Sequence, residues 1–234
     1  MFATPEFWSA LAAIVVIDLV LAGDNAIVIA LAARSLPKAI QRRAIIWGTV
    51  GAVVVRASLT LAVLWLLEVP GIMGAGGVLL IWIAYRLVAG DGGGKDHEVA
   101  PASGFWSAMR TIVIADAVMG LDNVLAVAGA AHGSVLLVVA GLVISIPIVV
   151  WGSTLILGWL ERFPGLLYVG GGVLAWTAAR MLVDEPLLEE FLNARSGLRT
   201  SLFAVIIGGV LGIAWLRNRK SAAARQDPRK EAVQ

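Results

Sequence analysis

The stretch DLVLAGDN, residues 18–25, decides the fold because it places two aspartates and an asparagine inside a long apolar segment. DAVMGLDN, residues 116–123, repeats nearly the same pattern 98 positions later. An acidic residue at the centre of a membrane helix opposes insertion by about 2.5 to 3.5 kcal/mol. A structural hydrogen-bonded pair that locks two helices together would not require four acids in two copies. The doubled pattern therefore favours a functional site.

The composition indicates a membrane protein. Of the 234 residues, 59% are hydrophobic and only 15% are charged, and the mean hydropathy is +0.89. A soluble domain has about 25% charged residues. The basic residues form short clusters between apolar blocks, which argues against nucleic-acid binding, and the absence of cysteine excludes disulfides and thiolate metal sites. Glu6 and Asp18 argue against a cleaved signal peptide, so we expect a retained first span.

We expect an all-α membrane protein with seven transmembrane helices, because seven segments approach the roughly 20 mostly apolar residues that a span needs. The short loops also predict an orientation, since cytoplasmic loops carry an excess of lysine and arginine. Only the loop after the fifth segment is ambiguous by charge, and alternation assigns it inside. The amino terminus is therefore expected outside and the carboxyl terminus inside. The seven segments are 8–33, 44–67, 70–89, 105–131, 134–160, 164–183 and 200–216.

The two halves of the chain repeat one another. Besides the Asp-Asn motifs, LLEVPG (66–71) loosely matches LERFPG (160–165), and Trp82 with Arg86 matches Trp176 with Arg180. Each half holds three spans, so the second enters the membrane from the opposite side, as in many secondary transporters. The expected units are a first three-helix repeat (1–89), a cytoplasmic glycine-rich linker (90–104), a second, inverted three-helix repeat (105–183), an extracytoplasmic loop (184–199), a seventh helix (200–216) and a basic cytoplasmic tail (217–234).

The spacing inside each motif raises a geometric question. Six positions on a regular helix amount to about 600°, so the two carboxylates would point about 120° apart. An unwound turn near Gly23 and Gly120 would swing both inward and free backbone carbonyls for coordination. Pseudo-symmetry would then bring the two Asp-Asn pairs face to face. The predicted metal-site residues are Asp18, Asp24, Asn25, Asp116, Asp122 and Asn123.

Such a cluster suits hard divalent cations, because it offers carboxylate, amide and carbonyl oxygens. Mg²⁺, Ca²⁺ and Mn²⁺ all prefer these ligands, and ligand type alone does not choose among them. Four ionised aspartates exceed the charge of one divalent ion by two negative charges, so either two ions bind, a cation pairs nearby, or carboxylates take up protons. Arg56, near the middle of the second span, is therefore expected to form a structural ion pair with an aspartate or to serve in gating or charge compensation.

Three other features have two readings each. His132 is expected as a solvated loop residue rather than a metal ligand. The hydroxyls of the fifth span could line a path or bond to preceding carbonyls. The acidic segment 184–190 could dock a partner, but an interfacial helix with leucines 187, 188 and 192 facing lipid is favoured. The fifth-span hydroxyl residues are Ser145, Ser153 and Thr154.

The two motif-bearing segments, DLVLAGDNAIVIALAARSLP and ADAVMGLDNVLAVAGAA, resemble the TerC family of integral membrane proteins, within the LysE-like transporter superfamily. The resemblance covers about residues 8–216. The short length without a C-terminal CBS module is similar to the YjbE-type branch of metal transporters. This resemblance implies a bacterial inner-membrane protein that handles metal, with Mn²⁺ efflux as the best supported activity and the six motif residues as ligands.

We therefore expect a transporter that exports Mn²⁺ by alternating access at a midplane site, with proton exchange as a candidate driving force. Export of another cation such as Ca²⁺ is an alternative, and a membrane-embedded diaspartyl protease is the rival enzyme. The protease is disfavoured because a dyad needs one aspartate from each helix, whereas each motif here supplies two aspartates and an asparagine. The partners considered are the metal ion, the lipid bilayer, a homo-oligomeric copy and extracytoplasmic metal-requiring proteins, with no nucleic acid and no organic cofactor.

Overall fold

The computed structural model describes residues 5–66, 69–89, 101–131, 134–193 and 196–225. Within the helices, some side chains lie outside the description, and those of Asp122 and Asn123 are among them. His132 lies outside the described residues altogether. The described chain is helical, with no strand, as expected from its composition. Its helices are α1 (Pro5–Ala33), α2 (Lys38–Leu66), α3 (Ile72–Ala89), α4 (Pro101–Ala130), α5 (Val135–Arg162), α6 (Leu166–Val183), α7 (Pro186–Asn193) and α8 (Ser196–Arg225).

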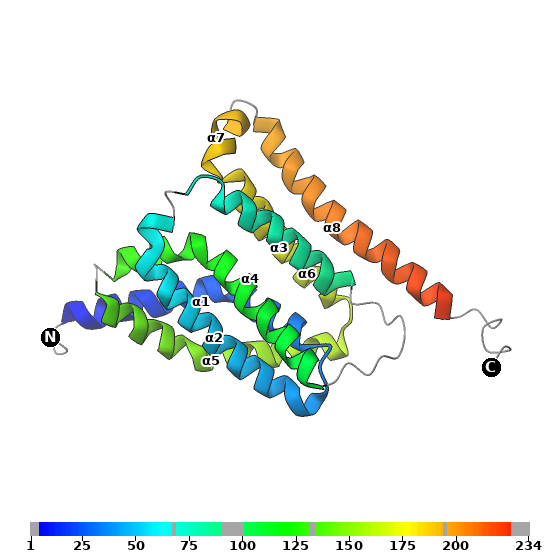
Figure 1. Cartoon of the computed structure of the whole chain (residues 1–234), viewed down its shortest axis with the longest axis horizontal. Helices are drawn as coiled ribbons and strands as arrows, with labels where there is room; N and C mark the ends of the chain where they lie inside the picture. Colours follow the sequence, from blue (N-terminus) through cyan, green and yellow to red (C-terminus); the bar gives the residue numbers. More distant parts are fainter. Residues whose placement is uncertain (1–4, 67–68, 90–100, 132–133, 194–195, 226–234) are drawn as a thin grey trace.

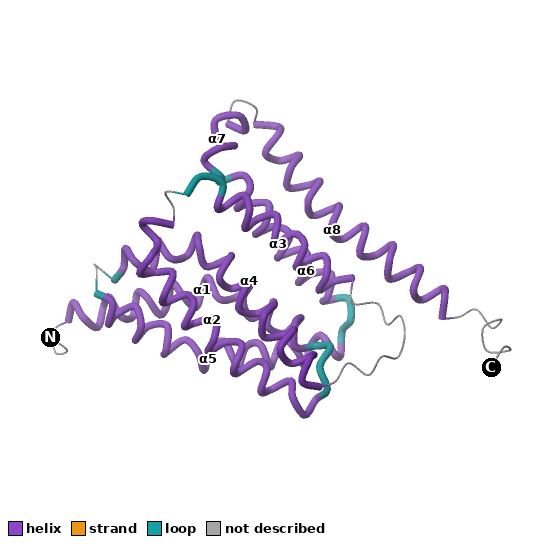
Figure 2. The backbone as a smooth tube through the Cα atoms, in the orientation of Figure 1, coloured by secondary structure: helices purple, strands orange, loops and turns teal. Residues whose placement is uncertain are grey.

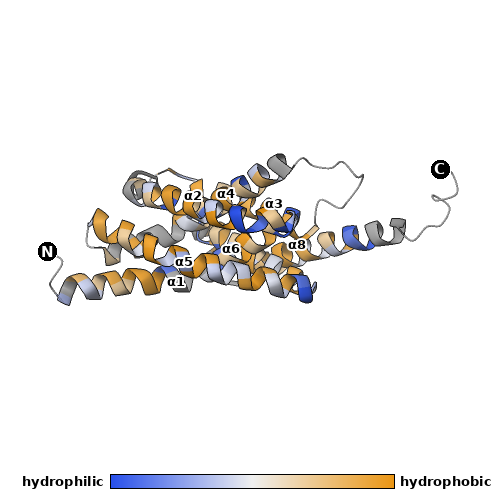
Figure 3. Ribbon diagram, turned by 90° about the horizontal axis from the view of Figure 1, so that it is seen from below, coloured by the Kyte–Doolittle hydropathy of each residue, from blue (hydrophilic) through white to orange (hydrophobic). Residues whose placement is uncertain are grey.

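Six described helices are long and apolar enough to cross a membrane, and the count reaches seven if the bent α1 is one span. Hydrophobic residues make up much of the length of the helices (Figure 3). Many large ones are exposed, including Trp47, Trp151 and Trp215. In water such a surface would be costly, so these faces suit lipid.

The boundaries differ from the sequence prediction at several places. Helix α4 begins at Pro101, inside the segment expected to be linker. Helix α8 begins at Ser196 and continues to Arg225, well into the expected tail. The expected loop 184–199 contains the short helix α7. Hydropathy reports the length of chain that suits hydrocarbon, whereas a helix can continue into water with polar residues.

Helices from the two halves of the chain lie side by side (Figures 1 and 2). Helix α1 packs along α5, α2 along α4, and α3 along α6. Helix α8 packs against α6 and α3 on the outer side (Figure 1). The largest group of buried hydrophobic residues spans α1 to α6 and reaches α8 through Val210 and Ala214.

Small residues allow these close contacts. A Cβ at Gly48 of α2 would lie 2.7 Å from Cδ1 of Ile112 on α4, and a Cβ at Gly141 of α5 would meet Cγ2 of Ile14 on α1. A Cβ at Gly77 of α3 would lie 2.9 Å from the backbone oxygen of Ala178 on α6. Helices in membranes associate through such small residues because lipid supplies little hydrophobic driving force.

Helix α1 does not contain the unwound turn that the sequence suggested. The backbone stays helical through residues 18–25, and the segments Phe7–Asp18 and Gly23–Ala33 are bent by 48° relative to each other. Helix α4 is likewise helical through Gly120. The expected break near Gly23 is therefore found only as a change in helix direction between Asp18 and Gly23, with the backbone there still helical.

A buried carboxylate ties the start of α3 to the end of α6. Oε1 of Glu185 accepts a hydrogen bond from the backbone N–H of Gly71 at 3.0 Å, and Oε2 accepts one from Gly74 at 2.7 Å. Glu185 is only 2% exposed. Gly71 has φ +85°, a conformation that glycine adopts without strain. Glu185 thus satisfies N–H groups that the first turn of α3 leaves unpaired.

Helix α7 agrees only in part with the prediction that the acidic segment forms an interfacial helix whose leucines face lipid. Leu187 and Leu188 are exposed, as a lipid-facing surface requires, but Leu192 is buried and packs inward. The leucines do not share one face. Leu192 was therefore wrongly assigned to lipid, because it serves the contacts of this short helix with α6 and α8.

Candidate functional site

An arginine lies between two aspartates from different halves of the chain. Nη1 of Arg56 on α2 donates to Oδ1 of Asp18 on α1, and Nη2 donates to Oδ1 of Asp116 on α4. The three residues are 4%, 2% and 7% exposed, so the charges are shielded from solvent. The sequence predicted that Arg56 pairs with an aspartate, and it pairs with two. We call Asp18, Arg56 and Asp116 the ion triad.

The packing of α2 on α4 positions the ion triad. Gly48 and Gly51 of α2 lie against Ile112 and Val113 of α4, which brings the two helices close. Two turns further on, Gly120 of α4 lies beside the Arg56 side chain, where an added Cβ would be 3.7 Å from Nε. Gly120 therefore packs beside the Arg56 side chain in a helix that is not unwound.

Asp24 and Asp18 face different neighbours, although both belong to the first motif. Oδ1 of Asp24 accepts a hydrogen bond from the backbone N–H of Asn25 at 2.9 Å. Oδ2 of Asp24 accepts one from the hydroxyl of Thr177 on α6 at 3.5 Å. The Thr177 hydroxyl also lies 3.2 Å from the carbonyl oxygen of Val173, so Asp24 shares this donor. Two directions are what the six-residue spacing predicts for a helix that is not unwound.

The two groups are electrostatically connected. Asp24 is half-buried and lies within electrostatic range of both Arg56 and Asp116. Like charges repel and opposite charges attract more strongly in a low-dielectric interior than in water. A change in the charge of the ion triad therefore changes the electrostatic potential at Asp24. Asp24 is also more accessible to solvent than Asp18.

Several buried polar atoms near these groups have no hydrogen-bond partner among the described residues. Both amide atoms of Asn25 are in this state, as are Oδ2 of Asp116 and the hydroxyl of Thr49 on α2. Each such group costs about 1 to 3 kcal/mol when left unpaired. Native proteins rarely keep them without a reason, so these oxygens are available to a ligand.

Thr177 is a site residue that the sequence analysis missed, and Thr49 is a buried polar residue of α2 that it also missed. Thr49 precedes Arg56 by seven positions, which places the two on the same face of α2. Thr177 directly follows Trp176, one of the repeat landmarks. The spacing to Arg56 could have drawn attention to Thr49, but only the packing of α6 on α1 brings Thr177 to Asp24.

The predicted ligands are only partly brought together in the described part of the chain. Asp18 and Asp116 meet through Arg56, and Asp24 adjoins Asn25. Asp122 and Asn123 lie on α4, but their side chains fall outside the description. Among the described side chains, no group of three or more carboxylates, imidazoles or thiolates is arranged to hold a metal ion.

The hydroxyls of α5 adopt one of their two expected roles. Ser145 donates to the carbonyl oxygen of Leu142 at 2.8 Å, and Ser153 donates to that of Val149 at 2.6 Å. Thr154 donates to the carbonyl oxygen of Val150 at 2.7 Å. These bonds to preceding carbonyls account for the hydroxyls without a path along α5.

Comparisons with known proteins agree with the membrane fold. The model of the integral membrane protein TerC family matches residues 3–223. The chain is similar to the uncharacterized membrane protein YjbE of Bacillus subtilis (strain 168), with 43% identity over 88% of this chain and 94% of that protein. It is 25% identical to the uncharacterized membrane protein YkoY of the same organism, and covers 64% of that protein. It is 25% identical to the UPF0053 protein YegH of Escherichia coli (strain K12), and covers 47% of it. No solved structure matches the chain.

Proposed function

Because the chain belongs to the TerC family of integral membrane proteins, we propose that it is a secondary transporter that exports a divalent cation, Mn²⁺ in the first instance. The observation that carries this proposal is the ion triad of Asp18, Arg56 and Asp116, buried where α1, α2 and α4 meet. Charged groups inside a membrane protein are expensive and mark the paths of ions or protons.

Arg56 acts in this proposal as a built-in competitor of the transported ion. Its guanidinium occupies the two carboxylates that a divalent cation would otherwise bind. Mn²⁺ carries twice its charge and prefers carboxylate oxygens. When Mn²⁺ binds, Arg56 withdraws from at least one aspartate, and its return helps to release the ion.

The remaining ligands come from groups around the ion triad. Oδ2 of Asp116 and the amide oxygen of Asn25 are buried and without partners among the described residues. Asp24 adds a carboxylate that Thr177 and the Asn25 N–H orient. We assign Asp122 and Asn123 to the same site by the repeat of the motif. Oxygen ligands of this kind also accept Ca²⁺ or Mg²⁺, so the choice of Mn²⁺ rests on the family resemblance.

We further propose that the two halves form inverted three-helix repeats, with α8 outside them. Two contacts support this. Ile14 of α1 meets Gly141 of α5, and Ile112 of α4 meets Gly48 of α2. Ile14 and Ile112 are separated by 98 positions, as are Asp18 and Asp116, so two equivalent isoleucines each contact a glycine on the middle helix of the other half.

Alternating access then follows from movement of one repeat against the other around the site between them. The amino terminus is outside and the carboxyl terminus is cytoplasmic in this proposal, with the protein in the bacterial inner membrane. Crowded carboxylates in a low-dielectric interior can take up protons as the metal leaves, which would couple export to proton exchange. A proteolytic dyad is disfavoured, because Arg56 lies between Asp18 and Asp116, whereas the two carboxyl groups of a dyad contact each other and share one proton.

Flux measurements on reconstituted protein test the proposal. Proteoliposomes carrying the wild-type chain should take up Mn²⁺, and Asp24→Asn and Asp122→Asn should each abolish uptake. Asp184→Asn is the matched control, because Asp184 is an exposed acid that contacts Arg180 and Arg199 away from the site. Uptake that survives both site substitutions, in protein with an unchanged unfolding midpoint, would refute the proposal.

A further inference from the structure

A pocket of about 400 Å³ lies apart from the ion triad, between the end of α1, the end of α3 and the beginning of α4. It adjoins the loop after α1, which carries several basic residues and is cytoplasmic in the proposed orientation. Its lining combines two arginines and three hydroxyl residues with apolar side chains. The polar and aromatic members are Arg34, Ser35, Trp82, Arg86, Ser107 and Thr111.

The pocket has a positive character. Among the described residues that line it, there is neither aspartate nor glutamate. Arg34 is half-buried and has no carboxylate partner among the described residues, and burial lowers the pKa of its guanidinium. A partly buried cation without a counter-charge is unfavourable unless an anion joins it. The pocket therefore repels a metal cation and attracts an anion, which separates it from the proposed transport site.

Arg86 adds a second cation at the pocket, on α3. Its guanidinium carbon lies 5.4 Å from the ring centroid of Trp82, and both side chains are exposed. Guanidinium groups hold phosphate oxygens through paired N–H donors. Two arginines, one in the loop after α1 and one on α3, with hydroxyls of α4 nearby, suit the charge of a phosphate group.

The rest of the lining indicates where such a phosphate comes from. Leu31, Leu36, Ile83 and Leu87 give the pocket an apolar wall that a free inorganic ion would not use. Trp82 is 53% exposed on the outer surface of α3, which faces lipid in a membrane protein. Tryptophan is enriched at the level of lipid headgroups. An amphiphile with a phosphate head and an apolar body satisfies both parts of the pocket.

We propose that this pocket binds the phosphate of an anionic phospholipid from the cytoplasmic leaflet, with Arg34 and Arg86 as its cationic ligands. Basic pockets between transmembrane helices on this side of the membrane suit such headgroups. The inference does not depend on metal transport, because none of the lining residues belongs to the ion triad or contacts Asp24.

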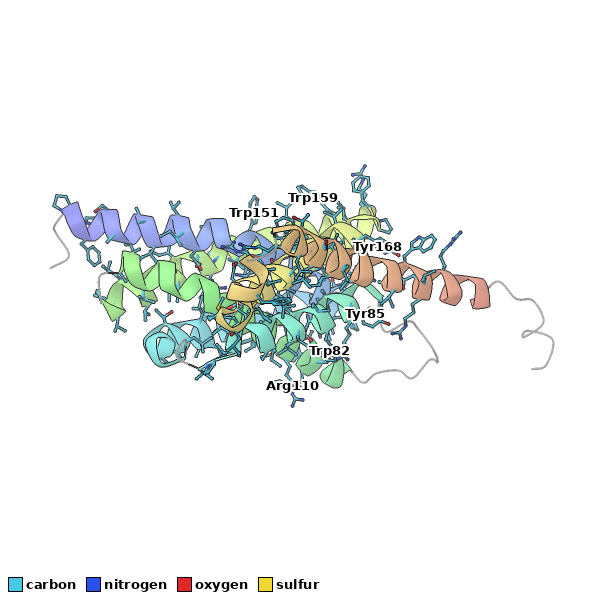
Figure 4. All side chains as sticks on the ribbon, turned by 90° about the horizontal axis from the view of Figure 1, so that it is seen from above. Trp82, Tyr85, Arg110, Trp151, Trp159 and Tyr168 are labelled. Atoms are coloured by element: carbon cyan, nitrogen blue, oxygen red, sulfur yellow. The ribbon has the colours of Figure 1, made fainter. Side chains whose placement is uncertain are left out.

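Native mass spectrometry of the full chain in detergent tests the proposal with phosphatidylglycerol as the probe. Arg34→Gln should weaken phosphatidylglycerol binding at least about tenfold, since a charge-assisted hydrogen bond to phosphate is lost. Arg110→Gln is the control, because Arg110 is exposed on the same helix as Thr111 but does not line the pocket and extends away from the helices (Figure 4). Arg34→Lys should recover part of the binding.

The outcomes separate the sources of the phosphate. Selective loss in Arg34→Gln, with weak binding of phosphatidylcholine, supports the proposal. Equal loss in Arg34→Gln and Arg110→Gln would overturn it, because the lipid would then respond only to overall charge. Binding of inorganic phosphate to wild-type protein without binding of phosphatidylglycerol would overturn the assignment to lipid. A matched unfolding midpoint for Arg34→Gln and wild type, measured without added lipid, confirms that the variant is folded.

Discussion

Asp18 and Asp116 stand 98 positions apart in the sequence, yet each contacts the same guanidinium of Arg56 through one carboxylate oxygen. The contact joins one motif to its second copy. Two aspartates and one arginine leave a net charge of one negative unit in the interior, so loss of the arginine would leave both carboxylates without a counter-charge. Three helices, α1, α2 and α4, therefore share one electrostatic unit.

Loss of the arginine should destabilise the fold. Arg56→Gln leaves two buried carboxylates facing each other, and we expect a loss of about 3 to 5 kcal/mol in the free energy of unfolding. The unfolding midpoint in detergent measures this. Adding Asp18→Asn and Asp116→Asn to Arg56→Gln removes the excess charge and should restore part of the stability. A triple variant as unstable as Arg56→Gln would contradict this account.

Asn25 should show opposite effects on stability and transport. Its amide atoms are buried and have no partner among the described residues. Asn25→Leu removes them and should leave stability unchanged or raise it by about 1 kcal/mol, because no unsatisfied group remains. Mn²⁺ uptake by proteoliposomes should fall strongly. Reduced stability with normal uptake would assign Asn25 a purely structural role.

Thr177 should affect the affinity of the site for the ion more than the stability of the fold. Thr177→Val removes the hydroxyl that reaches Oδ2 of Asp24, and a hydrogen bond to a charged group contributes about 1.5 to 3 kcal/mol. The Thr177 hydroxyl lies 3.5 Å from Asp24 and is shared with the carbonyl oxygen of Val173, so we expect its contribution to be at the low end of this range. Thr177→Val should therefore increase KM for Mn²⁺ and change stability little. Thr177→Ser should behave as wild type. Thr154→Val, at an exposed hydroxyl on α5, is the negative control.

The equivalent glycines should respond alike if the repeats are related by pseudo-symmetry. Gly48→Leu and Gly141→Leu each force a side chain against an isoleucine, and overpacking of this kind costs about 1 to 3 kcal/mol. Gly152→Leu should be tolerated, because an added Cβ meets nothing within 4 Å. Ile112→Ala should rescue Gly48→Leu, and Ile14→Ala should rescue Gly141→Leu. Tolerance of either glycine substitution without its rescue partner would argue against tight packing there.

The orientation can be tested on a clean background, because the chain contains no cysteine. Ser35→Cys, in the loop after α1, should be protected from a membrane-impermeant maleimide in intact cells and labelled in inverted vesicles. Ser134→Cys, before α5, should show the reverse. Labelling of both positions from the same side would contradict the expected alternation of the loops.

The sequence predicted the membrane class and the approximate position of each span, because a run of about 20 apolar residues has few other uses. It also predicted that Arg56 would find an aspartate, since an arginine deep in an apolar span requires a counter-charge. The number of aspartates it contacts depends on the register of α2 against both α1 and α4. That register is set by tertiary contacts such as Gly48 with Ile112, which a single helix does not reveal.

The predicted break near Gly23 is present in α1 only as a bend. Glycine permits unwinding but does not require it, and the 48° bend in α1 redirects the helix without unwinding it. Asp24 also has a hydrogen-bonding neighbour of its own on α6, Thr177. The contact of Thr177 with Asp24 could not be predicted, since no pattern in the sequence of α6 indicates that this helix packs beside α1.

Glu185 sets a condition on how the molecule can open. It fastens the start of α3 to the end of α6 through hydrogen bonds to Gly71 and Gly74, at the extracytoplasmic end in the proposed orientation. Separation of α3 from α6 at that end would leave the buried Glu185 carboxylate without these two hydrogen-bond donors. We therefore expect the two helices to stay together there. Gating displacements should then concentrate in α1, α2, α4 and α5, which carry the ion triad and its immediate surroundings.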